Sequence, residues 1–428
     1  MINFFKDKYQ SFSTLMKKIK SRSTIVTAMA ASEPFGFYSE IHNHIKDKED
    51  IKVYCANPTK PYEVYLDDGC SGHIELKPMF LTSSVRIHQQ KNHVHYIPQH
   101  LSQWAENMRR EEEIDIFWGS CSLPDERGFA SLGPSVCYES ECIKAAKMVI
   151  LEVNPQLPVT YGSTLVPLNQ VDYLYLNEHP VPEVSMTPTN SQSVKIAEHI
   201  ADLVPNGATI QLGIGSIPNA LSEVLLHKKD LGIHTEMIND TIIKLAKAGV
   251  VTGRHKSIWP DKIIGSFALG TSELYDFING NPVVEFYPAS IVNDPIRIGR
   301  NYKMISINTA VQIDITGQVC SESVGHLELS GVGGATDTHI GAQRSEGGRG
   351  IIALDSLTKK GKSKIVLELL PGAKVSISRN DIDTVVTEYG IANLRGKTVC
   401  DRAKNLISIA HPSVRDELLH QAKKVGYL

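Results

Sequence analysis

A glutamate and a glycine-rich loop offer the two groups that covalent acyl chemistry requires. Glu236 follows a strand-like run at residues 231–234, and residues 331–334 form a Gly-Val-Gly-Gly loop. A carboxylate is a weak nucleophile in water, so an enzyme that uses one must strip its hydration and meet the charge that develops on the attacked carbonyl with fixed donors. Glycine lets backbone amides come that close. Each segment alone has a simpler explanation, a solvated acid or a turn, so the hypothesis depends on their combination with other segments.

A second glycine-containing turn lies at residues 209–218, where a strand-like run passes through Gly213 and Gly215 into a helix. We expect Ser216 to cap that helix and Pro218 to lie in its first turn. Such a turn presents amides to an anion or a carbonyl. It lacks the third glycine of a dinucleotide fingerprint and the Gly-Lys-Ser/Thr ending of a phosphate loop, so neither of those standard sites is predicted.

Other catalytic arrangements find less support. No Gly-x-Ser-x-Gly motif occurs, which argues against a nucleophilic serine. The pairs His42 with His44 and His93 with His95 could each place two imidazoles on one side of a strand. No third and fourth ligand stands at a recognisable spacing, so we expect a polar surface there and no metal site.

The composition indicates a globular, soluble protein. The chain has 428 residues, of which 42% are hydrophobic and 21% charged, with a formal net charge of −3. This charge gives no reason to expect nucleic acid or a membrane surface as a partner, although local basic patches could still hold an anionic ligand. The length exceeds what one core usually fills, so two domains are expected.

Cysteine usage and the amino-terminal segment favour the cytoplasm. The seven cysteines are scattered and odd in number, which does not suggest a disulfide framework. Basic residues before the apolar run 25–31 could imitate a short signal peptide. We prefer a helix at residues 4–19 followed by a first strand, because the apolar spacing of that segment is helical.

Strand-like runs alternate with helical patterns along most of the chain. The runs lie at residues 25–29, 51–55, 114–118, 148–153, 209–212, 263–267, 304–307, 351–354 and 364–366. Alternation of this kind predicts an α/β fold with mostly parallel sheets, whose ligands bind beyond the carboxyl ends of strands. Proline and small polar residues concentrate at 178–192, and a new helix is expected at 193–203. We therefore predict an amino-terminal domain at 1–185 and a carboxyl-terminal domain at 186–428.

Taken together, these segments resemble a known family. The chain is similar to the class I coenzyme A transferases, in the branch of 4-hydroxybutyrate CoA-transferases and acetyl-CoA hydrolases. The resembling segments are residues 152–154, 211–218, 232–238, 330–334, 378–381 and 386–392. The resemblance runs from about residue 20 to the end and is strongest after residue 205.

The resemblance implies roles for individual residues. Glu236 would accept the acyl group, with Gly331 and Gly333 of the glycine loop holding the thioester oxygen. The residues implied in binding coenzyme A or substrate are Gln211, Gly213, Gly215, Val332, Gly334, Arg379 and Asn380. Arg379 and Asn380 are implied only as supporting residues near the site, and a charge-paired turn explains them nearly as well.

The resemblance also implies an architecture and a list of partners. It indicates two open α/β domains with the active site in the cleft between them, the acyl pocket on the amino-terminal domain, and coenzyme A with the nucleophilic glutamate on the carboxyl-terminal domain. A homodimer is expected, with no metal and no permanently bound cofactor, since coenzyme A is a substrate.

Three functions follow from these observations. The first is transfer of coenzyme A between a short acyl-CoA, such as acetyl-, butyryl- or succinyl-CoA, and a small carboxylic acid such as 4-hydroxybutyrate. The second is hydrolysis of acyl-CoA on the same scaffold, and the third is non-catalytic binding of coenzyme A. The acid is not identified. A dicarboxylic acid would require an extra cation in the pocket, for which Lys60 and Arg127 are both candidates.

Overall fold

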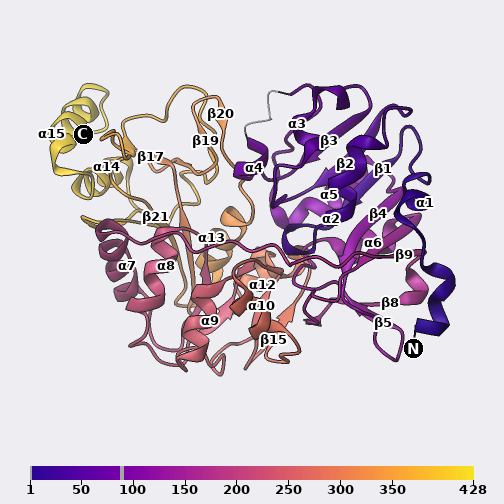
Figure 1. Cartoon of the computed structure of the whole chain (residues 1–428). Coiled ribbons are helices and arrows are strands. Elements are labelled where there is room, and N and C mark those ends of the chain that lie inside the picture. The colour runs from indigo at the N-terminus through magenta and orange to yellow at the C-terminus, as the bar shows by residue number, and fades with distance from the viewer. Residues whose placement is uncertain (1, 87–90) are drawn as a thin grey trace. The chain divides into compact units, whose positions relative to one another are not determined.

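The computed structural model describes residues 2–86 and 91–428, which divide into two compact units (Figure 1). Unit 1 comprises the chain up to Val184 together with Glu236–Asn239 and Ile264–Val292. Unit 2 comprises Ser185–Thr235, Asp240–Ile263 and Asn293–Leu428. Residues 236–239 and 264–292 lie beyond the boundary predicted at residue 185, yet they pack with unit 1. The first of these segments contains Glu236.

Unit 1 contains a six-stranded sheet in the order β3-β2-β1-β4-β6-β9, and all its neighbouring strands are parallel. The strands are β1 (Thr24–Thr27), β2 (Ile51–Cys55), β3 (Ile74–Pro78), β4 (Ile116–Cys121), β6 (Met148–Val153) and β9 (Tyr173–Leu176). Most of their residues are buried, as expected of parallel strands covered on both faces. The chain passes from β1 to β2 and β3 and then returns to the other side of β1, so the strand order reverses between β1 and β4. Ligands bind at the carboxyl ends of strands at such a point.

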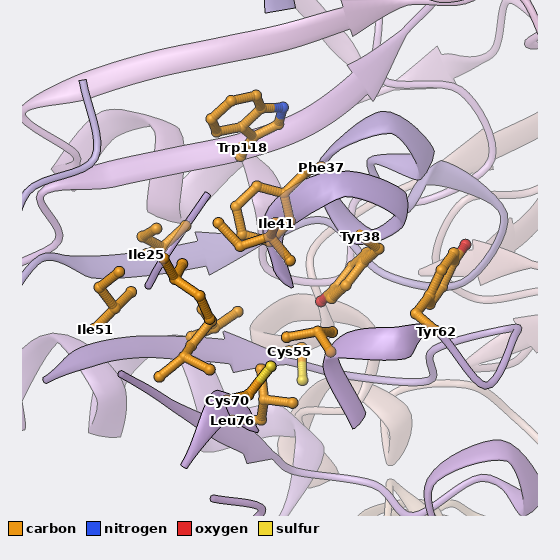
Figure 2. Close-up of a cluster of buried hydrophobic side chains, with 14 of the residues drawn as sticks. Ile25, Phe37, Tyr38, Ile41, Ile51, Cys55, Tyr62, Cys70, Leu76 and Trp118 are labelled. Atoms are coloured by element: carbon orange, nitrogen blue, oxygen red, sulfur yellow. The ribbon is translucent and has the colours of Figure 1, made fainter. Parts of the chain in front are cut away.

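Aliphatic side chains and several large aromatic rings form the core beside this sheet (Figure 2). The ring of Phe37, on helix α2 (Phe35–Glu40), lies 5.0 Å from that of Trp118 on β4. The ring of Tyr38 stacks on that of Tyr62, with centroids 5.1 Å apart. Large buried rings contribute several kcal/mol each to stability, so this packing fixes α2 and the segment after β2 against the sheet.

Shorter elements complete unit 1. Its small strand pairs are β5 (Phe129–Ser131) with β8 (Leu165–Pro167), β12 (Met237–Ile238) with β14 (Phe267–Ala268), and β15 (Val284–Phe286) with β7 (Tyr161–Gly162). Its further helices are η1 (Ile2–Lys8), α1 (Phe12–Met16), η2 (Ala30–Ser32), η3 (Ile41–Asn43), α3 (Glu63–Leu66), η4 (Asp68–Cys70), α4 (Ser83–Arg86), η5 (Leu101–Gln103), α5 (Trp104–Glu111), α6 (Glu139–Ala145), η6 (Leu168–Gln170), α10 (Ser272–Ile278) and α11 (Ala289–Val292).

Unit 2 is built on strands in the order β24-β23-β21-β16-β10-β11, parallel except for the antiparallel pair of β23 and β24. The strands are β10 (Thr209–Leu212), β11 (Gly232–His234), β16 (Met304–Thr309), β21 (Arg349–Ala353), β23 (Thr384–Thr387) and β24 (Gly390–Asn393). The chain leaves β10 toward β11 and later returns to β16 on the other side. Unit 2 thus has its own reversal of strand order, between β10 and β16.

Helices and small sheets surround the strands of unit 2. The helices are α7 (Ser191–Leu203), α8 (Ser216–Val224), α9 (Asp240–Lys247), α12 (Pro295–Ile298), α13 (Ala335–Arg344), α14 (Val399–Ser408) and α15 (Pro412–Lys424). The short strands are β17 (Gln312–Asp314), β18 (Val319–Cys320), β19 (Ser323–Val324), β20 (Leu327–Glu328) and β22 (Ile365–Val366). Strand β13 (Ile263–Gly265) begins at the last residue of a unit 2 segment and lies mostly in unit 1. Helix α13 packs against β16 and β21, which places its amino terminus beside the end of β16.

The structure confirms the α/β fold with mostly parallel sheets. The strands predicted at residues 51–55, 148–153 and 209–212 are β2, β6 and β10. The helix predicted at 193–203 is α7, which begins two residues earlier because Asn190 caps it through a capping box with Ser193.

The single helix predicted at residues 4–19 is wrong. The segment forms the 3-10 helix η1 and the short helix α1, with an extended stretch between them. There Tyr9 bridges to Leu174, and the Gln10 amide donates to the Leu174 carbonyl at 2.9 Å. Strand β9 lies at the edge of its sheet, so its free backbone groups bind this stretch and interrupt the helix.

All seven cysteines are unpaired, and all but Cys400 are buried. In the described ranges 2–86 and 91–428, no helix has both the length and the apolar character needed to cross a bilayer.

Candidate functional site

Glu236 lies in unit 1, at a bend between β11 and β12, and is half-buried. Its carbonyl accepts hydrogen bonds from the backbone amides of Ser266, at 2.8 Å, and Phe267, at 3.1 Å. Strands β12 and β14 then pair in parallel, with Met237 opposite Phe267. These bonds hold the backbone of Glu236 firmly, which satisfies the first requirement of a positioned nucleophile.

The segment that holds Glu236 lies beside the carboxyl end of β1. Strand β14 contacts η2, the turn that follows β1. Phe267 also bridges to Ser135, whose hydroxyl donates to Glu139 at 2.7 Å. The same Glu139 oxygen accepts the Met29 amide at 3.1 Å. Glu236 is therefore anchored at the point where the strand order of unit 1 reverses.

The backbone is strained at this edge of the sheet. Ala30 is fully buried yet has a φ of 51°, and Asn57, after β2, has a φ of 47°. This conformation costs alanine about 1 kcal/mol or more, whereas asparagine adopts it more readily, and strained residues cluster at functional sites.

Glu33 provides a buried carboxyl group at the same edge, which the sequence analysis did not single out. It is 2% exposed and accepts hydrogen bonds from the Thr59 amide at 3.0 Å, from the Thr59 hydroxyl, and from the Tyr62 hydroxyl at 2.6 Å. Burial raises the pKa of Glu33 from 4.5 to about 7, against these hydrogen bonds and the Lys60 charge, which lower it. The sequence feature that could have identified Glu33 is an acid among small and apolar residues, shortly after a strand.

Cys137 shows the electrostatic effect of the neighbouring acids. Its thiol is buried, and its pKa lies well above the usual value because of burial and then the negative charges of Glu139 and Glu236. A thiol in this state is not a nucleophile at neutral pH.

In unit 2, the glycine turn at residues 213–216 follows β10 at the second reversal of strand order. The Gly213 amide donates to the Ile307 carbonyl at 3.1 Å. Gly215 has a φ of 115° and is the N-cap of α8, so the prediction that Ser216 is the cap is wrong, and Ser216 begins the helix. A side chain at position 215 would require a backbone conformation that only glycine adopts readily. Ile214 is 61% exposed, which leaves this turn open to a ligand.

Gln211 joins this turn to the amino terminus of α13. Its side-chain oxygen accepts from the Ser306 hydroxyl at 2.7 Å and from the Ile307 amide at 3.1 Å. The Asn308 amide group in turn donates to the Thr338 hydroxyl at 3.1 Å. The network consists of neutral groups, so its hydrogen bonds do not depend on pH in the ordinary range.

The glycine loop at residues 331–334 leads into α13. Gly331 and Gly333 are buried, Val332 is partly exposed, and Gly333 has a φ of 54°. Gly334 is the N-cap of α13, and its carbonyl accepts the Thr338 amide at 2.9 Å. The amides of such a turn can present donors to a carbonyl oxygen, as the sequence analysis expects.

Arg379 and Asn380 lie on an exposed turn of unit 2. The Asn380 amide donates to the Ser378 hydroxyl at 3.1 Å, and Arg402 donates to the Arg379 carbonyl. The preceding Ser376 carbonyl accepts from Thr336 in the first turn of α13 at 2.6 Å. This bond ties the turn to the glycine loop through the backbone.

The two histidine pairs lie in different local structures. His42 lies in the 3-10 helix η3, whereas the backbone of His93 and His95 bonds to Leu76 of β3 through an isolated bridge at Val94. The His93 ring contacts the Val64 carbonyl at 3.0 Å. Residues 2–86 and 91–428 contain no group of three or more potential metal-ligating side chains.

Comparison with known proteins places these features in context. Residues 3–185 match the family model "Acetyl-CoA hydrolase/transferase N-terminal domain", and residues 270–422 match the corresponding C-terminal domain. The chain is 38% identical to a 4-hydroxybutyrate coenzyme A transferase of Clostridium kluyveri, over 98% of each chain. It is 40% identical to a succinyl-CoA:cyclohexane-1-carboxylate CoA transferase of Geobacter metallireducens, over 95% of this chain and 93% of the relative.

A solved structure shows the same fold. The crystal structure of RipA from Yersinia pestis matches with a TM-score of 0.94 at 32% identity, covering 99% of both chains.

Proposed function

We propose that this chain, which belongs to the acetyl-CoA hydrolase/transferase family, moves coenzyme A from a short-chain acyl-CoA to a small carboxylic acid through a thioester on Glu236. The main support is the setting of Glu236, half-buried and fixed by its backbone beside the strained end of β1. Relatives that act on 4-hydroxybutyrate and on succinyl-CoA support a small acid as acceptor.

The proposed cycle balances without any outside energy source. The Glu236 carboxylate attacks the thioester carbonyl, and the carbon–sulfur bond breaks. Coenzyme A departs as its thiolate, and an acyl-glutamyl anhydride forms on the protein. The thiolate then attacks the glutamyl carbonyl, releases the first acid as its carboxylate, and forms a glutamyl-CoA thioester. The acceptor acid repeats these steps in reverse. One thioester replaces another, so the protein must supply position, desolvation and exclusion of water.

Backbone amides are the proposed hydrogen-bond donors to the oxyanion. We assign the thioester oxygen to the loop containing Gly331 and Gly333, because a buried glycine turn at a helix start can offer amides without a side chain in the way. The turn at Gly213 and Gly215, supported by Gln211, is assigned to coenzyme A binding. Val332, Gly334, Arg379 and Asn380 are assigned supporting contacts with coenzyme A.

An acceptor-dependence assay tests transfer against hydrolysis. Butyryl-CoA is supplied with and without acetate, and both free thiol and acetyl-CoA are measured. Transfer predicts acetyl-CoA formation that requires acetate, with little free thiol in its absence. Thiol release at the same rate with or without acetate would show that water is the acceptor and would overturn the proposal.

A further inference from the structure

We propose that Lys60 binds a second anionic group on the acid substrate. Short dicarboxylic acids are then preferred over monocarboxylic acids of the same size whose other end is uncharged. This inference rests on the proposed transferase function and names the acid that the enzyme selects.

Lys60 belongs to the segment that follows β2. Its ammonium group lies 4.6 Å from the centre of the Phe35 ring. Phe35 in turn stacks on the His179 ring, with centroids 4.8 Å apart. Cation–π contact attracts an ammonium group to a ring without neutralising its charge, so the charge remains available to a ligand.

Lys60 has no ion-pair partner in the described part of the chain, residues 2–86 and 91–428, and it is exposed. The carboxyl group of Glu33 feels the Lys60 charge, but it is already bonded to Thr59 and Tyr62. Burial raises its pKa to about 7, so near neutral pH a large part of it is uncharged.

The neighbouring histidine adds no competing charge. Burial lowers the pKa of His179, and the positive charge of Lys60 lowers it further. Its ring lies within hydrogen-bond distance of the Pro180 carbonyl, at 3.0 Å from Nδ1, and of the Asn154 side-chain amide, at 3.4 Å from Nε2. A neutral, fixed His179 ring therefore supports Phe35 and leaves Lys60 as the cation of this cluster.

The cluster shares one edge of unit 1 with Glu236. The Glu236 carbonyl binds the Phe267 amide, and β14, which contains Phe267, contacts η2. Glu33 directly follows η2 and binds Thr59, the neighbour of Lys60. One short turn thus separates the elements that carry the reacting carboxylate and the cation, which suits a small acid with an anionic group at each end.

An unsatisfied polar atom also indicates a ligand at this edge. The side-chain oxygen Oδ1 of Asn57 is buried and has no hydrogen-bond partner in the described part of the chain. A buried acceptor without a donor costs about 1 kcal/mol or more, which a bound molecule or its water could offset.

Arg127, the other cation considered from the sequence, lies in a different setting. It is on the turn between β4 and β5, its side chain is 84% exposed, and it pairs with Asp125 at 3.2 Å. The Asp125 side chain also accepts the amides of Arg127 and Phe129. Its charge is thus engaged in the turn, which makes Arg127 a matched control for Lys60.

The test compares two acceptor acids of nearly equal shape, succinate and its monoamide succinamate, with acetyl-CoA as donor. The ratio of their kcat/KM values is measured for wild type, Lys60→Met and Arg127→Met. We expect wild type to prefer succinate and Lys60→Met to lower the ratio about tenfold, the effect of one lost charge-assisted hydrogen bond. Arg127→Met should keep the wild-type ratio.

Two results would overturn the inference. One is a wild-type preference for succinamate, and the other is an unchanged ratio in Lys60→Met. Either result requires measurable transfer, so both leave the proposed function standing. Absence of transfer to any acid in wild type would instead refute the proposed function itself.

Discussion

The two reversals of strand order in this molecule carry opposite chemistry. At the end of β1 in unit 1, the chain places buried carboxyl groups, Glu33 and Glu139, and anchors Glu236 beside them. At the end of β10 in unit 2, it places glycine amides and the neutral side chains of Gln211 and Asn308. The same topology thus supplies ionisable groups in one unit and fixed dipoles in the other. Under the proposed function, unit 1 supplies the nucleophile and unit 2 supplies the amide donors.

The largest expected effect is on the nucleophile of unit 1. Glu236→Ala should lower turnover at least about a thousandfold, because the covalent route has no substitute for the carboxylate. The measurement is acyl transfer from butyryl-CoA to acetate. The control is Glu75→Gln, which alters a partly exposed acid on β3 that pairs with Lys77 at 3.4 Å. Equal losses in both variants would show that Glu236 acts only as a structural acid.

The next largest effect concerns the glycine loop at residues 331–334 in unit 2. Gly331→Val should lower kcat about a hundredfold, since a side chain on the buried loop would crowd the thioester and misdirect an amide donor. The melting temperature should change little, and both quantities are measured on the same preparation. Normal turnover in the folded variant would contradict the role of the loop.

A smaller effect concerns the neutral network at the same place. Gln211→Leu removes the acceptor of the Ser306 hydroxyl and the Ile307 amide and should lower the free energy of unfolding by about 2 kcal/mol. Urea denaturation at several pH values provides the measurement. Because the lost groups do not titrate, the loss should be equal at pH 5 and pH 8, and a strong pH dependence would contradict the comparison between the units.

The remaining effect is a change in pH dependence in unit 1. Glu33 keeps its proton in the folded state up to about pH 7, whereas the unfolded chain releases it near 4.5. The folded state binds more protons between these values, so the contribution of Glu33 to stability is full below about pH 4.5 and is lost as pH rises to 7. Glu33→Gln should therefore flatten the fall of the unfolding free energy over this range. An unchanged slope in urea denaturation would show that Glu33 does not carry it.

Sequence patterns predicted the architecture because local and tertiary preferences agree in most strands. The runs that became β2, β6 and β10 are apolar, bounded by turn residues, and buried in the structure. The amino-terminal helix failed because the edge of β9 offers backbone partners to Gln10, a contact that periodicity does not encode. The grouping of residues 236–239 and 264–292 with unit 1 is likewise a tertiary fact without a local signal.

The candidate site was predictable only in part. The glycine segments and Glu236 were found through their types and their resemblance to a family. Glu33 was missed because its pKa depends on burial and on bonds to Thr59 and Tyr62. These two residues follow strand β2, whereas Glu33 precedes it, so no local pattern links them. The sequence left Lys60 and Arg127 equivalent, and only the structure separates an unpaired cation over Phe35 from one engaged by Asp125.

The central claim is that Glu236 carries coenzyme A during turnover, and intact-mass measurement after incubation with acyl-CoA tests it most directly. Wild type should gain the mass of coenzyme A less one water, whereas freshly purified Glu236→Gln should gain none. Equal labelling of the two proteins, or a wild type that stays unlabelled while it turns over, would contradict the account.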